Sequence, residues 1–389
     1  MSSTQILVGD CRAILATLPD QSVQCCVTSP PYFGLRDYGH DGQIGLEPTP
    51  DDFVDAMVAV FREVRRVLRD DGTLWLNLGD SYAGSWGAQS RDHAGKHAPN
   101  ISAMSANQVK AAQNRSSGTG SLTRTPGLKP KDLIGIPWMV AFALRADGWY
   151  LRSEVIWAKP NGMPGSQLDR ATSSHETVFL LSKSKHYWSD FDAIKTPARE
   201  STLIRTAQDI QAQAGSHRAN GGAKTNGAMK AVGGLTGSPH GRHSLGEAIP
   251  EKERRTDKQR GHSRRHDGFN DRWDAMEKSE QQAKPAMMRD VWFVSSGAGY
   301  KGSHFAVMPE EIARRCVLAG CPEGGLVIDP FSGAGTTALV ANRHGRNAIG
   351  VELNPEYAAM SQERISGDGM FADVAVSHAN DNAAVCHAA

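Results

Sequence analysis

Residues 326–337 read LVIDPFSGAGTT, and this stretch decides the fold class of the chain. The apolar residues 326–328 predict a buried strand, and Gly333 and Gly335 predict a tight turn into a helix that begins near Thr336. Such a turn lets the backbone come close to a ligand, which then lies at the N-terminus of the helix. The stretch therefore predicts an α/β fold with a ligand site at the carboxyl end of a strand.

Two carboxylates flank this turn. Asp329 ends the predicted strand and could accept a hydrogen bond from an ammonium group. The next predicted strand, residues 347–353, carries Glu352, 17 residues after Gly335, where a carboxylate can hold the ribose hydroxyls of a nucleoside. The glycine spacing also fits the dinucleotide fingerprint, so a nicotinamide-dependent oxidoreductase remains an alternative. No lysine follows the glycines, which excludes a phosphate-binding P-loop.

A second turn lies near the other end of the chain. Residues 28–32 read TSPPY and directly follow the apolar residues 23–27, so the turn closes a buried strand. Its two prolines stiffen the backbone and hold neighbouring hydrogen-bond acceptors at low entropic cost. An ordinary loop or a peptide ligand for a WW-type module are the alternatives. Both fit poorly with a turn that closes a hydrophobic strand.

Together, TSPPY and DPFSGAGTT resemble the motifs of the DNA amino-methyltransferases, which transfer a methyl group from S-adenosylmethionine to an exocyclic amine of a base. Their order along the chain is similar to that of the permuted β subgroup of this family. The resemblance covers residues 6–82, 133–182 and 291–365. It implies S-adenosylmethionine contacts at Asp329, Phe331, Gly333, Gly335, Thr336 and Glu352, at Asp10 beside the adenine amine, and at Phe305 near the methionine portion.

The same resemblance implies that Ser29, Pro30, Pro31 and Tyr32 are catalytic. The lone pair of an exocyclic amine is conjugated into the ring, so the amine is a poor nucleophile. Hydrogen bonds from it to the Ser29 hydroxyl and the Pro30 carbonyl would favour a tetrahedral nitrogen, while the extruded base stacks on Tyr32. Serine at position 29 is typical of members that act on cytosine-N4, and aspartate of those that act on adenine-N6. We expect cytosine, with adenine as the alternative.

The predicted fold is a doubly wound, mostly parallel sheet of the Rossmann-like methyltransferase type, with an antiparallel hairpin and two inserted loops. Residues 1–198 and 285–365 are expected to form the catalytic domain, which contains a basic flexible insertion at 83–130. Residues 199–284 are expected to recognise the target, and residues 366–389 to form a disordered tail. We predict strands at residues 5–8, 23–27, 73–78, 151–158, 176–182, 326–328 and 347–353, and helices at residues 11–17, 51–68, 133–146, 309–319, 336–344 and 355–365.

Basic residues gather in the two insertions, as phosphate contacts would require, although solvated linkers would look similar. The expected partner is double-stranded DNA, and the sequence leaves open whether a cognate restriction endonuclease is a second partner. The candidate DNA contacts are Arg36, Lys159, Arg254, Arg255, Arg264 and Arg265.

Composition narrows the class of protein. The chain has 389 residues, of which 39% are hydrophobic, and this length could hold one large α/β domain with insertions or two ordinary domains. Its six cysteines form no zinc-binding spacing, and no metal site is expected. It has no apolar run of ~18 residues and no signal-peptide pattern, so we expect a cytoplasmic protein. The sequence leaves the oligomeric state open. A non-enzymatic DNA-binding protein, and RNA or protein as methyl acceptor, are further alternatives.

Overall fold

The computed structural model describes residues 2–35, 39–40, 42–83, 128–129, 131–162, 167–196, 287–296, 307–368 and 373–378. The chain divides into two units, Met1–Ile194 together with Met288–Ala389, and Lys195–Met287. The described residues lie almost entirely in the first unit, which holds the fold and the site presented below. Within the described part of the chain, no helix is long and apolar enough to cross a membrane.

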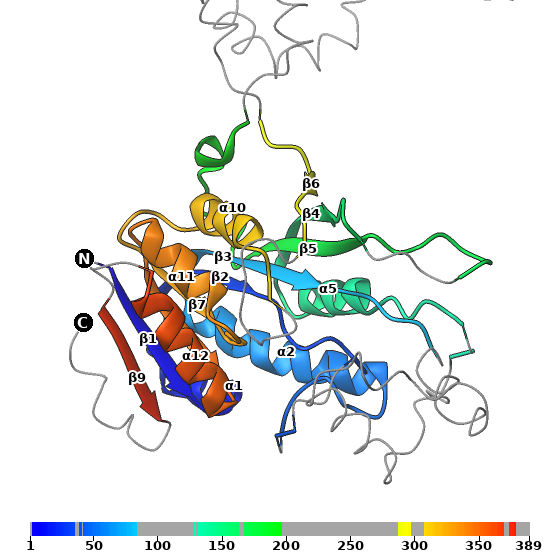
Figure 1. Ribbon diagram of the computed structural model, residues 1–389, viewed down its shortest axis with the longest axis horizontal. Coiled ribbons are helices and arrows are strands. Elements are labelled where there is room, and N and C mark those ends of the chain that lie inside the picture. The colour runs from blue at the N-terminus through cyan, green and yellow to red at the C-terminus, as the bar shows by residue number, and fades with distance from the viewer. Residues whose placement is uncertain are drawn as a thin grey trace, which may run out of the picture. The chain divides into compact units, whose positions relative to one another are not determined.

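One sheet forms the centre of this unit, with the strand order β6-β4-β5-β3-β2-β7-β8-β1-β9 (Figure 1). Every pair of neighbours is parallel except those that include β5, which runs antiparallel to both β3 and β4. The predicted mostly parallel sheet with an antiparallel hairpin is therefore confirmed. The strands are β1 (Ser3–Val8), β2 (Val23–Thr28), β3 (Leu68–Leu78), β4 (Tyr150–Ala158), β5 (His175–Ser182), β6 (Val291–Phe293), β7 (Leu326–Asp329), β8 (Asn347–Glu352) and β9 (Asp373–His378).

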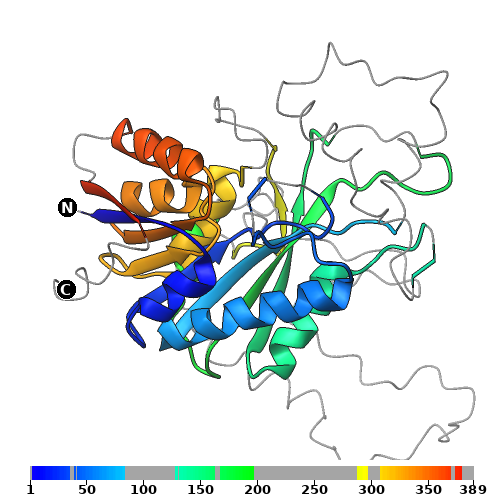
Figure 2. The same ribbon diagram turned by 90° about the horizontal axis from the view of Figure 1, so that it is seen from below.

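Helices cover both faces of the sheet, as Figure 2 shows from below. Helices α1, α2 and α5 contribute to one hydrophobic core, and α10, α11 and α12 contribute to the other. In α2, apolar side chains recur at helical spacing, and most of them are buried in the first of these cores. Within the described residues, these helices are α1 (Cys11–Thr17), α2 (Pro50–Val67), α5 (Ile136–Ala146), α10 (Glu310–Gly320), α11 (Thr336–Arg343) and α12 (Pro355–Ser366).

The two decisive turns meet because β2 and β7 are parallel neighbours. Cys26 pairs with Ile328, so the carboxyl ends of both strands reach the same edge of the sheet. There the Thr28 hydroxyl donates a hydrogen bond of 2.6 Å to the Asp329 carboxylate. Strand β8 ends beside β7 at the same edge. This edge is the place where ligands bind in open α/β sheets.

The structure differs from the sequence-based expectation at several elements. Strand β3 begins at Leu68 and not at residue 73, and β6 (Val291–Phe293) is not among the predicted strands. Helix α5 begins at Ile136 and not at residue 133, because the Asp80 carboxylate accepts hydrogen bonds from the Gly135 and Ile136 backbone nitrogens and caps the helix there. The tail 366–389 was expected to be disordered, but residues 373–378 form β9 and pair along β1. The tail prediction was therefore wrong for this segment, since β1 offers a free edge for pairing.

Candidate active site

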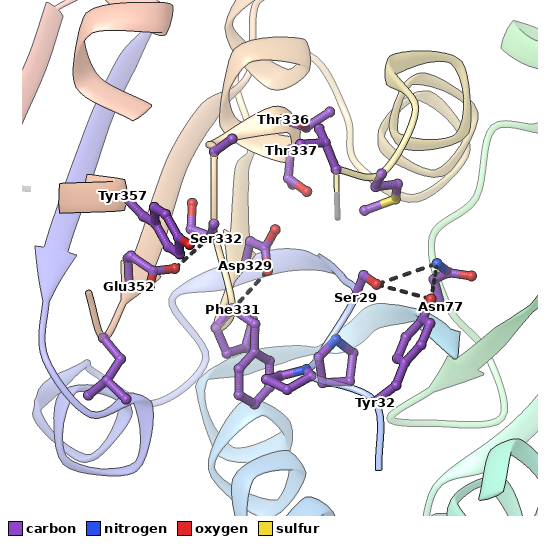
Figure 3. A pocket seen from close by; sticks show the side chains of 18 of the residues that line it. Ser29, Tyr32, Asn77, Asp329, Phe331, Ser332, Thr336, Thr337, Glu352 and Tyr357 are labelled. Carbon is purple, nitrogen blue, oxygen red and sulfur yellow. Dashed lines mark hydrogen bonds between the residues drawn. The ribbon is translucent and has the colours of Figure 1, made fainter. Parts of the chain in front are cut away.

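A cavity of about 540 Å³ opens at the carboxyl edge of the sheet, between the TSPPY turn, the glycine turn and the end of β8. Its volume lies in the range of small-molecule sites. Most of the sequence-predicted site residues line it: Asp10, Ser29, Pro30, Pro31, Tyr32, Lys159, Asp329, Phe331, Gly333, Thr336 and Glu352. In Figure 3, Ser29 and Tyr32 lie on one side, and Asp329 and Glu352 lie toward the other.

The glycine turn is held tightly against α12. Gly335 has a φ of +72°, a conformation that side chains disfavour. A Cβ at this position would also overlap the Ser361 hydroxyl. From the same helix, Arg364 donates hydrogen bonds of 2.8 Å to the Thr336 hydroxyl and 3.1 Å to the Ala334 carbonyl. Gly335 therefore lies on the side of the turn that packs against α12, and it does not line the cavity.

Asp329 is buried at the junction of the two turns, with 4% of its surface exposed. Its carboxylate accepts hydrogen bonds from the Thr28 hydroxyl and, at 3.0 Å, from the Phe331 nitrogen. Burial raises the pKa of Asp329 to about 6, and these hydrogen bonds only partly oppose the shift. A cation beside the carboxylate would compensate for the lost hydration. This position suits a ligand that carries an ammonium group.

Glu352 ends β8 and binds the glycine turn. Its Oε2 accepts a hydrogen bond of 2.7 Å from the Gly333 nitrogen, and its Oε1 accepts one of 2.9 Å from the Asn354 nitrogen. Partial burial raises the pKa of this carboxyl. Each carboxylate oxygen can accept a second hydrogen bond, so the side chain can still receive a pair of hydroxyls. The two carboxylates together fit a nucleoside that carries an ammonium group, as S-adenosylmethionine does.

Asp10 is engaged within the chain. It caps α1 by accepting a hydrogen bond of 2.8 Å from the Arg12 nitrogen, and its carboxylate pairs with the Arg12 guanidinium at 2.5 Å. The side-chain hydrogen bond from Arg12 holds the pKa of Asp10 below its ordinary value. Asp10 still lines the cavity, and the chain itself supplies its cationic partner.

The TSPPY turn is tied to β3 by a residue that sequence reasoning missed. The amide nitrogen of Asn77 donates hydrogen bonds of 3.0 Å to the Tyr32 hydroxyl and 3.4 Å to the Ser29 hydroxyl (Figure 3). Ser29 donates to the Tyr32 hydroxyl at 3.5 Å. A polar residue within the apolar run LWLNL was the available indication, because a buried amide needs partners.

Of the remaining predicted residues, the structure describes only Lys159. Lys159 lines it, but its ammonium forms an ion pair with Glu176 and packs over the Trp157 ring, with the nitrogen 4.6 Å from the ring centroid. It is thus partly buried within the site. Six predicted positions lie outside the described residues: Arg36, Phe305, Arg254, Arg255, Arg264 and Arg265.

The fold and the cavity define a class, that of the Rossmann-like α/β enzymes which bind a nucleoside cofactor at the carboxyl edge of the sheet. Residues 23–363 match the DNA methylase family N6_N4_Mtase, and the chain belongs to this family. The family uses S-adenosylmethionine as methyl donor, and this agrees with the predicted cofactor. The alternatives of a nicotinamide oxidoreductase and of a non-enzymatic DNA-binding protein were therefore wrong.

Several individual proteins are similar to this chain over nearly its whole length. The type II methyltransferase M.SmaI of Serratia marcescens is 39% identical over 366 residues, which span 94% of this chain and 91% of the relative. The type II methyltransferase M.Cfr9I of Citrobacter freundii is 36% identical over 95% of this chain and 89% of its own length. Among solved structures, PvuII DNA methyltransferase (cytosine-N4-specific) has a TM-score of 0.51 and 15% identity over 95% of this chain and 91% of that one. At this identity it supports the fold alone.

Proposed function

We propose that this chain methylates the N4 amine of a cytosine that is flipped out of double-stranded DNA, and that it is a modification methyltransferase of the permuted β subgroup. The observation that carries the proposal is the direct contact between the TSPPY turn and the cofactor edge. Thr28, one residue before Ser29, donates a hydrogen bond of 2.6 Å to Asp329. A methyl acceptor at one turn and a methyl donor at the other would therefore meet inside one cavity.

The residues of the cavity divide into two groups by their chemistry. Asp329 and Glu352 would bind the ammonium and the ribose hydroxyls of S-adenosylmethionine, which supplies an electrophilic methyl group when bound. The Ser29 hydroxyl and the Pro30 carbonyl would accept hydrogen bonds from the target amine and leave its lone pair available. Tyr32 would provide the flat surface for the extruded base. Aromatic stacking of this kind contributes ~1–3 kcal/mol per base.

The assignment to cytosine rests on Ser29. A hydroxyl at this position accepts a hydrogen bond without a negative charge, whereas an aspartate would add one. Serine here is the pattern of the cytosine-N4 members in the resemblance described above, and its hydroxyl faces the cavity beside Tyr32. Adenine-N6 is the alternative product.

We propose further that residues 199–284 recognise the target sequence and that Arg254, Arg255, Arg264 and Arg265 contact phosphates. These positions lie outside the described residues. The relatives M.SmaI and M.Cfr9I are type II methyltransferases, and this supports a pairing with a restriction endonuclease of the same target.

Mass spectrometry of nucleosides tests the proposal. DNA that lacks modified bases is incubated with the purified chain and S-adenosylmethionine and then digested. We expect 4-methylcytosine from the wild type, and a large fall in turnover without loss of cofactor affinity for Ser29→Ala. If the digest holds 6-methyladenine alone, the choice of base is wrong. A digest without either modified base, from a chain that binds the cofactor, contradicts the proposed reaction.

A further inference from the structure

The Tyr32 hydroxyl is bound by a residue that lies outside both the TSPPY and the DPFSGAGTT motifs. This hydroxyl donates a hydrogen bond of 2.5 Å to Oε2 of Glu176 on β5. The same oxygen accepts a hydrogen bond of 3.0 Å from the Asn77 amide. The other oxygen of Glu176 forms an ion pair with the Lys159 ammonium. All four side chains line the cavity.

The topology explains how Glu176 reaches this position. Strand β5 is antiparallel to both neighbours, so its first residues lie at the edge where β3 and β4 end. Glu176 pairs in register with Trp157 on β4, two residues before Lys159. The side chains of Lys159 and Glu176 are only 22% and 15% exposed. A charged pair that is so little hydrated needs close hydrogen-bond partners, and here Tyr32 and Asn77 provide them.

The ring of Tyr32 is also confined at its edge. Gly79 follows β3, and a Cβ at this residue would stand 2.5 Å from Cε2 of the ring. The ring thus packs directly on the backbone of Gly79, while its hydroxyl is bound by Glu176 and Asn77. The contact at Gly79 and the hydrogen bonds at the hydroxyl therefore restrict the ring from two points.

We propose that Glu176 is a positioning residue for methyl transfer: held by Lys159, it fixes the Tyr32 ring in the orientation in which the target base stacks. This inference rests on the role of Tyr32 in the proposed function. A fixed ring presents the amine in line with the methyl group without an entropic cost at each turnover. Because Glu176 acts through the Tyr32 hydroxyl, its effect depends on that hydroxyl being present.

A double-mutant cycle tests this dependence. Tyr32→Phe keeps the ring and removes the hydroxyl, while Glu176→Gln keeps the shape of the acceptor and removes its charge. We expect each variant to lower kcat by about tenfold or more, with the KM for DNA and the Kd for S-adenosylmethionine within about twofold of the wild type. The double variant should be no slower than the slower single variant. Glu154→Gln, on β4 and outside the lining of the cavity, is the matched control and should keep the wild-type kcat.

Three outcomes overturn the inference: a wild-type kcat for Glu176→Gln, a wild-type kcat for Tyr32→Phe, or losses that multiply in the double variant. If Glu176→Gln does not fold, Tyr32→Phe alone decides, because it leaves the pair of Glu176 and Lys159 in place. Tyr32→Ala separates this inference from the proposed function. If that variant retains full turnover, the stacking role of Tyr32 itself is wrong.

Discussion

The raised pKa of Asp329 predicts that cofactor affinity depends on pH. The carboxyl is buried, and its pKa in the free protein is about 6. The ammonium of S-adenosylmethionine binds the ionised form, so the bound state has a lower pKa than the free state. Protons therefore compete with the cofactor. Affinity should rise as the pH increases through about 6 and level off near pH 7.

The size of the effect follows from the ionised fraction. With a pKa of about 6, about 9% of Asp329 is ionised at pH 5 and about 91% at pH 7. If only the ionised form binds the ammonium, Kd should be about tenfold larger at pH 5 than at pH 7, equivalent to about 1.4 kcal/mol. Glu352, whose pKa is also raised, adds to the effect in the same direction. The cofactor ammonium stays protonated throughout this range.

Calorimetric titration of the protein at pH 5, 6 and 7 measures this dependence, and buffers of different ionisation enthalpy report the proton that is released. Asp329→Asn should bind the cofactor weakly and lose most of the dependence on pH. Asp71→Asn, at an exposed carboxylate on the amino-terminal side of β3, is the matched control and should behave as the wild type. The reasoning is refuted by a wild-type Kd that does not change between pH 5 and 7, or by an Asn variant that keeps the full dependence.

Two further predictions concern the Tyr32 pocket and the basic insertion. Gly79→Ala should lower kcat by about 100-fold with little change in cofactor affinity, because the new Cβ would move the Tyr32 ring by about 1 Å. Single-turnover kinetics measure this, and Gly162→Ala, whose Cβ would meet its nearest atoms at 3.5 Å, is the control; equal rates for both variants would contradict the steric argument. Neutralising the proposed phosphate contacts together should weaken DNA binding and flatten the dependence of log Kd on log salt, with cofactor affinity unchanged. The residues to be neutralised are Arg254, Arg255, Arg264 and Arg265. If the slope of log Kd against log salt does not change, these residues do not contact phosphates and belong to a solvated linker.

The two turns could be predicted from sequence because each is a local pattern at the end of a buried strand. TSPPY and DPFSGAGTT both follow apolar runs, and the carboxyl ends of parallel strands collect at one edge. That rule predicts that Ser29 and Asp329 lie at one edge, across about 300 residues of sequence. They share one cavity because β2 and β7 are also neighbours in the sheet, and the sequence pattern does not give that strand order.

The second layer of the site could not be predicted in the same way. Asn77, Gly79 and Glu176 are recognised only through their contacts with Tyr32, and these depend on the register of β3 against β5. A glutamate at the start of an antiparallel strand carries no local pattern that distinguishes it from a surface residue. Strand β9 was not predicted for a similar reason. Its six residues form a strand because they pair with the edge of β1, and this pairing leaves no local pattern in the sequence.

The position of the unit Lys195–Met287 in the chain explains why so long an insertion is compatible with the geometry of the site. The unit Lys195–Met287 interrupts the chain between Ile194 and Met288, and both flanking segments belong to the unit that contains the sheet. The entropy of closing a loop grows only with the logarithm of its length, by about 0.6 kcal/mol for each doubling. The sheet contacts of β5 and β6 therefore hold the two flanks whatever the length of the insertion. Asp329, Glu352, Tyr32 and Glu176 all lie on elements outside it. Residues 199–284, which we propose recognise the target, can thus change in sequence while the residues proposed for the chemistry keep their geometry.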